Sequence, residues 1–266
     1  MRIPIFQVDA FANDLFAGNP AAICVLDEAI SAELMQSIAM ENNLSETAYI
    51  WPLDEDAAHW HIRWFTPSCE VDLCGHATLA SAHVLFSHLG VSGQRVRFES
   101  TVHGVLTVDR EGPWLTLNFP TDSPIAVEKP AGLSEALGAE VCEVRKGRDD
   151  YLVLLANEDS VRVLNPDLGY IKGLPARGLM VTAPGESVDF VSRFFGPGSG
   201  IDEDPVTGSA HTTLTAYWSE KLRKTTFTAR QLSARGGDLR CELRGDRVLI
   251  SGQAVTYLKG QIGRLD

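Results

Sequence analysis

Several features that define large protein classes are absent from this chain of 266 residues. No uninterrupted apolar run approaches the roughly 18 residues that a membrane-spanning helix needs. The stretch from Met1 to Asp9 is broken by polar residues too early to supply the apolar core of a secretory signal. The formal net charge is -12, and no stripe of Lys and Arg is present to neutralise a phosphate backbone. We therefore expect neither a membrane nor a nucleic acid as a partner.

The signatures of the common nucleotide and nucleophile sites are also missing. No strand is followed by Gly-x-Gly-x-x-Gly, and no Gly-x-x-x-x-Gly-Lys-Ser/Thr loop occurs, so nucleotide cofactors have no support. Ser209 does not lie in a Gly-x-Ser-x-Gly elbow, which disfavours a hydrolase. We expect chemistry that needs no cofactor.

Cysteine is scarce and shows no pairing rhythm. The five cysteines are Cys24, Cys69, Cys74, Cys142 and Cys241. An odd number without regular spacing indicates a reduced, cytoplasmic protein. Cys69, Cys74 and His76 lie close in sequence, but no second paired set accompanies them, so we expect no metal site.

What is present is the composition of a folded, soluble protein. Hydrophobic residues make up 44% and charged residues 22% of the chain, which is ordinary for a globular protein. The length suits one large domain or two of ordinary size.

One pattern occurs twice, about half a chain apart. The first copy runs from Arg63 to Ala77 and the second from Arg193 to Ala210. Each copy reads as a strand, an acidic loop, and then a glycine with a small polar residue that opens a helix. A repeat of this period favours an α/β protein with two similar halves.

Hydrophobic periodicity and turn residues predict the individual elements. The expected strands cover 3–11, 22–26, 44–51, 58–65, 105–108, 114–118, 151–156, 179–182 and 188–195, and a meander follows in the last forty residues. The expected helices cover 31–42, capped by Ser31, then 75–89, ended by Gly90, and 208–221. Residues 109–112 read as a hairpin turn, and the prolines at 120, 124 and 130 as the crossover between the halves.

The two glycines of the repeat suggest an anion site. The first amides of a helix have no intrahelical partner, and the helix dipole places partial positive charge there. Gly75 and Gly208 would let an anion approach these amides closely. One such copy is more simply the start of a packed helix, but the recurrence favours two facing helix ends that bind a small carboxylate.

Glu46 is the candidate proton carrier. It lies near a helix-to-strand junction between Leu44 and Ala48, where partial burial would raise its pKa toward neutrality. From sequence alone an ordinary surface glutamate is the favoured interpretation, and Glu203 and Asp204 share this ambiguity. His76 reads equally as a substrate donor, a helix cap or a core residue.

The ordered motifs resemble one known family. They are Asp9-Ala10-Phe11 with Gly18-Asn19-Pro20, Asn43 to Ala48, Cys74 to Thr78, and Asp204 to Ala210. Together these segments are similar to the phenazine-biosynthesis isomerase (PhzF-like) family. The resemblance spans nearly the whole chain and is specific for the family, not for a substrate.

The resemblance implies a fold like that of diaminopimelate epimerase. Two pseudo-symmetric α/β halves, each a curled mixed sheet around a central helix, would comprise 1–120 with a last strand near 253–266, and 121–252. The active site would lie in the cleft between them. Family members are typically homodimers.

The resemblance also implies roles for individual residues. Glu46 matches the glutamate that moves a proton between two carbons of an unsaturated cyclic acid. His76, Asp204 and Ser209 match residues that bind the substrate or assist the transfer. These roles describe a cofactor-independent isomerase.

One departure concerns the racemases of the same fold, which use two thiols, each preceding a helix glycine. Here Cys74 precedes Gly75, but Thr207 precedes Gly208, and a hydroxyl is far too weak an acid for that work. A symmetrical two-thiol racemase is disfavoured. An epimerase that uses Cys74 with another acid, and a carboxylate-binding protein without chemistry, stay open.

Overall fold

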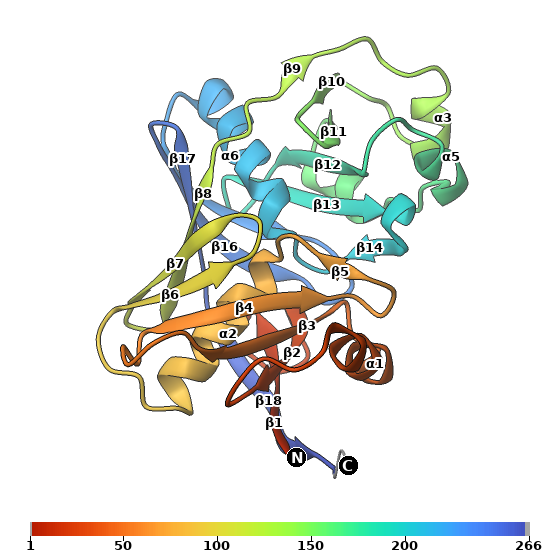
Figure 1. Cartoon of the computed structure of the whole chain (residues 1–266). Helices are drawn as coiled ribbons and strands as arrows, with labels where there is room; N and C mark the ends of the chain where they lie inside the picture. Colours follow the sequence, from red (N-terminus) through yellow and green to blue (C-terminus); the bar gives the residue numbers. More distant parts are fainter. Residues whose placement is uncertain (1, 264–266) are drawn as a thin grey trace. The chain divides into compact units, whose positions relative to one another are not determined.

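A computed structural model describes residues 2–263 of the chain, which fold as a mixed α/β protein (Figure 1). Two compact units divide the chain: unit 1 comprises Met1–Asn118 and Ser251–Asp266, and unit 2 comprises Phe119–Ile250. Among the described residues, no helix combines the length and apolarity required to cross a bilayer.

Unit 1 is built from strands and two helices. Its strands are β1 (Ile3–Ala10), β2 (Asn19–Val25), β3 (Glu46–Pro52), β4 (His59–Phe65), β5 (Glu70–Val71), β6 (Arg95–Ser100), β7 (Gly104–Glu111), β8 (Trp114–Pro120) and β18 (Ala254–Ile262). Its helices are α1 (Ala32–Asn42) and α2 (Gly75–Ser87). Ser31 caps α1 as expected, because its hydroxyl accepts from the amide of Leu34 at 3.3 Å.

The strands of unit 1 pair in the order β18-β1-β2-β3-β4-β6-β7-β8, and β5 pairs with β4. The pairs β2–β3 and β4–β6 are parallel and the others antiparallel. Helix α2 packs against β1, β2, β3, β7 and β18 of this unit. Ten of its residues are buried, as the apolar sequence of this segment predicts.

Unit 2 repeats this plan. Its strands are β9 (Ile125–Ala126), β10 (Glu143–Lys146), β11 (Asp150–Leu154), β12 (Gly178–Pro184), β13 (Phe190–Gly196), β14 (Ile201–Asp204), β15 (Thr226–Gln231), β16 (Gly237–Arg244) and β17 (Arg247–Gly252). Its helices are α3 (Leu133–Leu137), α4 (Glu158–Arg162), α5 (Leu168–Lys172), the short 3-10 helix η1 (Pro197–Ser199) and α6 (Gly208–Leu222).

The pairing pattern of unit 2 matches that of unit 1 strand for strand. The order β10-β11-β12-β13-β15-β16 has parallel pairs at β11–β12 and β13–β15, and β14 pairs with β13 as β5 pairs with β4. Helix α6 takes the place of α2, with Trp218 stacked on Phe190 of β13 at 5.7 Å. The twofold sequence pattern therefore corresponds to a twofold structural plan.

The equivalence of the two units has one sharp exception at the start of the third strand. Glu46 pairs with Ala21 at the beginning of β3, and Gly178 pairs with Asp150 at the beginning of β12. A Cβ at Gly178 would lie 2.8 Å from the carbonyl oxygen of Phe195. Packing thus excludes a side chain where unit 1 carries a carboxylate.

Several predicted boundaries need correction. The helix that begins at Gly75 ends at Ser87, although Gly90 does adopt a left-handed φ of 70°. The hairpin turn predicted at 109–112 lies later, because Glu111 still pairs with Trp114. The acidic loops contain the short strands β5 and β14, and helices α3, α4 and α5 are too short for sequence periodicity to reveal.

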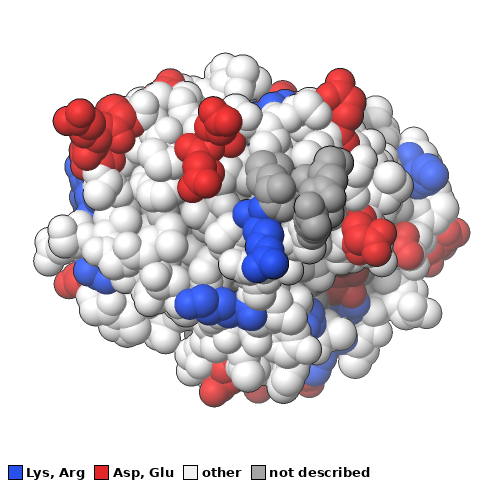
Figure 2. All heavy atoms as spheres, turned by 60° about the horizontal axis from the view of Figure 1, so that its bottom comes forward, with Lys and Arg blue, Asp and Glu red and all other residues white. Residues whose placement is uncertain are grey.

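Charged side chains are dispersed over the face that Figure 2 shows. On the face that Figure 2 shows, Lys and Arg lie singly among acidic and uncharged residues, and the described residues form no continuous basic stripe there.

Candidate active site

The candidate site of unit 1 forms where two parallel strands and a helix begin. Asn19 starts β2, Glu46 starts β3, and Gly75 is the first residue of α2 after Cys74. Gly18, with a φ of 66°, makes the turn into β2, and a Cβ there would collide with the carbonyl of Ala10. Only glycine therefore allows the backbone to deliver Asn19 to this point.

His76 is the centre of the group. Its Nε2 lies 3.2 Å from Oε2 of Glu46, and its Nδ1 lies 3.3 Å from Nδ2 of Asn19. The Sγ of Cys74 lies 3.5 Å from the same Nδ1. The side chain of Glu46 is 12% exposed and that of His76 6%. A carboxylate, an imidazole and a thiol thus lie together at a site that is largely excluded from solvent.

The hydrogen bonds define the state of this imidazole. Burial lowers the pKa of His76 to about 3, so the ring is neutral near pH 7. With the Asn19 amide nitrogen donating to Nδ1, the neutral ring would carry its proton on Nε2, the nitrogen that lies 3.2 Å from Oε2 of Glu46. His76 therefore places a neutral ring nitrogen beside the carboxylate of Glu46.

The same three side chains are also ligands of the kind that metals use. A carboxylate oxygen of Glu46, the Sγ of Cys74 and a ring nitrogen of His76 lie within 4.8 Å of one another. Cys69, which the sequence had grouped with Cys74 and His76, is exposed and contacts Thr66 in a turn instead.

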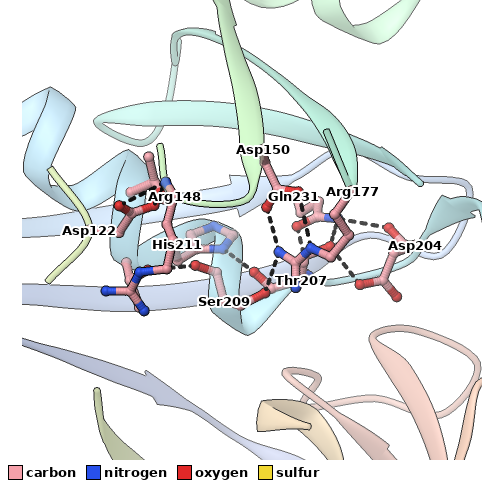
Figure 3. Close-up of polar contacts among 11 residues, drawn as sticks. Asp122, Arg148, Asp150, Arg177, Asp204, Thr207, Ser209, His211 and Gln231 are labelled. Atoms are coloured by element: carbon pink, nitrogen blue, oxygen red, sulfur yellow. Dashed lines mark hydrogen bonds and ion pairs between the residues drawn. The ribbon is translucent and has the colours of Figure 1, made fainter. Parts of the chain in front are cut away.

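In unit 2 a buried glutamine organises the start of α6 (Figure 3). The Gln231 side chain, fully buried on β15, accepts from the amide of Thr207 at 2.9 Å. Its Nε2 donates to the carbonyl of Asp204 at 2.7 Å and to Oγ1 of Thr207 at 3.1 Å. The hydroxyl of Thr207 then donates to the carboxylate of Asp204 at 2.6 Å. Thr207 therefore orients Asp204 as an acceptor.

Ser209 at the same helix end is held by an arginine. Nη2 of Arg177 donates to Oγ of Ser209 at 3.2 Å, while Nε donates to Oδ1 of the buried Asp150 at 3.0 Å. Since Arg177 fills an acceptor position of the hydroxyl, the proton of Ser209 is directed elsewhere. Gly208 is the first residue of α6, and the side chain of Thr207 makes no capping bond to it.

The acidic loops have a structural use. Arg63 makes a two-pronged bond to Glu70 at 2.6 and 2.7 Å, and Arg193 makes the same bond to Glu203 at 2.7 and 2.8 Å. Each arginine also lies over the phenylalanine two residues later. Glu203 is therefore committed to an ion pair, which separates it from its neighbour Asp204 as a candidate.

Sequence reasoning did not identify the supporting residues of either unit. Gln231, Arg177 and Asp150 lie outside the repeated pattern, and no local signal marks them. Asn19 lies in the predicted Gly-Asn-Pro turn. The clue in the sequence was a polar residue directly after a glycine, and that glycine adopts a left-handed conformation.

The geometry can now be compared with known proteins. The family described as phenazine biosynthesis-like protein (PhzC-PhzF) matches residues 8–260. The chain belongs to this family. A relative from Pseudomonas aeruginosa described as an uncharacterized isomerase is 52% identical over 262 residues, covering 98% of this chain and 99% of the relative.

Solved structures agree with the family and the fold. The crystal structure of a PhzF-family protein from Enterococcus faecalis has a TM-score of 0.95 and 43% identity, covering 99% of this chain and all of the other. A hydroxyproline epimerase from Agrobacterium vitis has a TM-score of 0.63 at 11% identity, covering 98% of this chain and 92% of that one, which shows the fold alone. The protein is an isomerase of the PhzF-like family with an epimerase-like fold.

Proposed function

We propose that this PhzF-like isomerase moves a proton within a small, cyclic or unsaturated carboxylic acid, without a cofactor, and that Glu46 carries the proton. The observation that carries the proposal is the 3.2 Å contact between Oε2 of Glu46 and Nε2 of a neutral His76 in a nearly buried setting. A carboxylate that takes a proton from one carbon of the substrate and returns it to another acts as a general base and then as a general acid.

The neighbouring residues have supporting roles in this proposal. His76 lies beside Oε2 of Glu46, and the carboxylate exchanges its proton with a substrate carbon. The amides that begin α2 at Gly75 and α6 at Gly208 bind carboxylate oxygens. Asp204 and Ser209, whose directions are set by Thr207 and Arg177, bind the substrate or assist the transfer. A homodimer and a cytoplasmic location stay predictions.

A solvent-exchange screen tests the proposal. Cyclic dienoic acids and cyclic amino acids are incubated with the protein in deuterium oxide, and isomerisation and deuterium uptake are followed by NMR. With a substrate identified, Glu46→Gln should lower turnover by about a hundredfold to ten-thousandfold, because the carrier is removed while its shape is kept. Glu41→Gln, at an exposed position of α1, is the matched control.

The outcome that contradicts the proposal is full turnover in Glu46→Gln. Cys74→Ser should change turnover little, because the thiol is not the proton carrier.

A second candidate, an epimerase that uses Cys74, is favoured by the 3.5 Å contact between its Sγ and Nδ1 of His76. It predicts the opposite pair of results: α-hydrogen exchange that disappears in Cys74→Ser and survives in Glu46→Gln. The two single variants therefore separate the candidates.

A further inference from the structure

The donor atoms around His76 have the spacing of a tetrahedral metal site. Nε2 of His76 lies 3.2 Å from Oε2 of Glu46 and 4.0 Å from Sγ of Cys74. In a zinc site made of nitrogen, oxygen and sulfur, neighbouring ligand atoms are about 3.3 to 3.7 Å apart. All three atoms lie within 4.8 Å of one another, so side-chain movements of up to about an ångström would bring them to bonding distance of one ion.

The chemistry of the three ligands selects the metal. Thiolate and imidazole favour Zn²⁺ and similar borderline or soft ions over Mg²⁺ and Ca²⁺, which take oxygen ligands. A thiolate and a carboxylate would together balance the two positive charges of the ion. Cys74 is 6% and His76 5% exposed, so the charges would be neutralised where water cannot screen them.

We propose that Glu46, Cys74 and His76 form an inhibitory site for Zn²⁺ or a similar thiophilic divalent cation. The ion takes a carboxylate oxygen of Glu46 and a ring nitrogen of His76, and a metal-bound carboxylate cannot exchange a proton with a substrate, so a bound metal stops the isomerase. The inhibition rests on the proposed function of Glu46, whereas the binding does not.

Metal binding changes the protonation of Cys74 and the tautomer of His76. The thiol of Cys74 loses its proton to solvent as the metal–sulfur bond forms. The proton of His76 moves from Nε2, which takes the metal, to Nδ1. The Asn19 side chain, which now presents its nitrogen to Nδ1 at 3.3 Å, turns its amide so that the oxygen accepts that proton. Metal-bound histidines commonly have such a partner on the second nitrogen.

Cobalt titration of the chelator-treated full chain tests binding without any substrate. Co²⁺ should give the visible bands of a tetrahedral ion and a thiolate-to-cobalt charge-transfer band, with about one proton released per ion, and Zn²⁺ should abolish both bands by displacement. The charge-transfer band should vanish in Cys74→Ser and persist in Cys69→Ser, whose thiol is exposed. Circular dichroism verifies that both variants are folded.

Two further variants address the other parts of the site. Glu46→Gln should keep the charge-transfer band but weaken cobalt affinity at least about tenfold, and Asn19→Ala should weaken it about 10- to 100-fold. No band at saturating Co²⁺, a band that survives in Cys74→Ser, or an unchanged affinity in Glu46→Gln would overturn the site.

The metal site and the proposed function fail separately. Zn²⁺ should stop isomerisation of an identified substrate, and a chelator should restore it. If cobalt binds through Cys74 while Glu46→Gln retains full turnover, the proposed function is wrong and the metal site holds. If Glu46→Gln abolishes turnover while no cobalt binds, the proposed function holds and the metal site is wrong.

Discussion

At the scale of single residues, the candidate site contains a histidine, His76, that stays uncharged. Burial keeps His76 neutral, so the ring nitrogen that lies 3.2 Å from Glu46 keeps the same charge across the physiological pH range. A charged imidazole would instead stabilise the anionic carboxylate and make it a weaker base. His211 of unit 2 is buried in the same way. Its Nδ1 lies 2.8 Å from the carbonyl of Thr207, and its Nε2 is buried without a partner among the described residues.

Buried histidines make the stability of the fold depend on pH. Burial lowers the pKa of His211 and of His83 from 6.5 to about 4. Below pH 6.5 the unfolded chain therefore binds protons that the folded chain does not. The free energy of unfolding should fall as the pH drops from 6.5 to about 4, by up to about 1.4 kcal/mol per pH unit for each histidine.

Urea denaturation at pH 7 and pH 5 measures this dependence. His211→Gln keeps a side-chain amide that can donate to Thr207 but cannot titrate, so its loss of stability between the two pH values should be smaller than that of the parent protein. Equal losses in both proteins would show that His211 protonates freely in the folded state.

At the scale of secondary-structure elements, the two copies of the motif differ in how firmly their loops are fixed. Arg193 is 11% exposed and also donates to the carbonyl of Leu164 at 2.7 Å, so it ties β13 to the segment after α4. Arg63 is 24% exposed and its partner Glu70 is 40% exposed. The same ion pair is thus part of the interior in unit 2 and near the surface in unit 1.

This difference predicts unequal costs for the same substitution. Arg193→Met should lower the free energy of unfolding by about 2 to 4 kcal/mol, because it leaves Glu203 and a carbonyl without their donor. Arg63→Met should cost about 1 kcal/mol or less, because solvent screens the pair. Chemical denaturation of the two variants compares them directly, and equal costs would contradict the argument.

The entry into α6 depends on a single strand residue. Gln231 satisfies one donor and two acceptors at Thr207 and Asp204, all from a fully buried position. Gln231→Leu should cost about 2 to 4 kcal/mol of unfolding free energy, since these polar groups would be buried without partners. The exposed Gln94→Leu is the control and should change stability by less than about 0.5 kcal/mol. A loss in Gln231→Leu no larger than in the control would be inconsistent with this role.

The sequence predicted elements well where periodicity or a cap was strong. The cap at Ser31, the alternating strand β4 and the apolar helices after Gly75 and Gly208 were all anticipated, and the family motifs indicated the fold class. Short elements such as α4, with five residues, were missed because one turn contains too little pattern.

The candidate site was less predictable, for a physical reason. A side chain such as Gln231 acquires its function only when β15 pairs in parallel with β13, a contact that joins residues far apart in sequence. The contact between Glu46 and His76 likewise joins a strand end to a helix start. The assigned catalytic roles stay predictions.

At the scale of the whole molecule, a duplicated plan supports two different chemistries. Both units have the same order of parallel and antiparallel pairs, and both present a helix that opens with glycine. Yet unit 1 combines carboxylate, thiol and imidazole, and unit 2 has hydroxyls that are oriented by Gln231 and Arg177. The two units therefore share a backbone plan but differ in the side chains of their candidate sites.

Gly178 has a stereochemical consequence. With no room for a side chain at that position, the counterpart of Glu46 is missing from unit 2, and in the proposed mechanism Glu46 alone removes and returns the proton. One base works on one face of the substrate, so the shift should be suprafacial. In deuterium oxide, part of the product should retain the substrate's own hydrogen at the new carbon; complete solvent exchange under single-turnover conditions would argue for a second base.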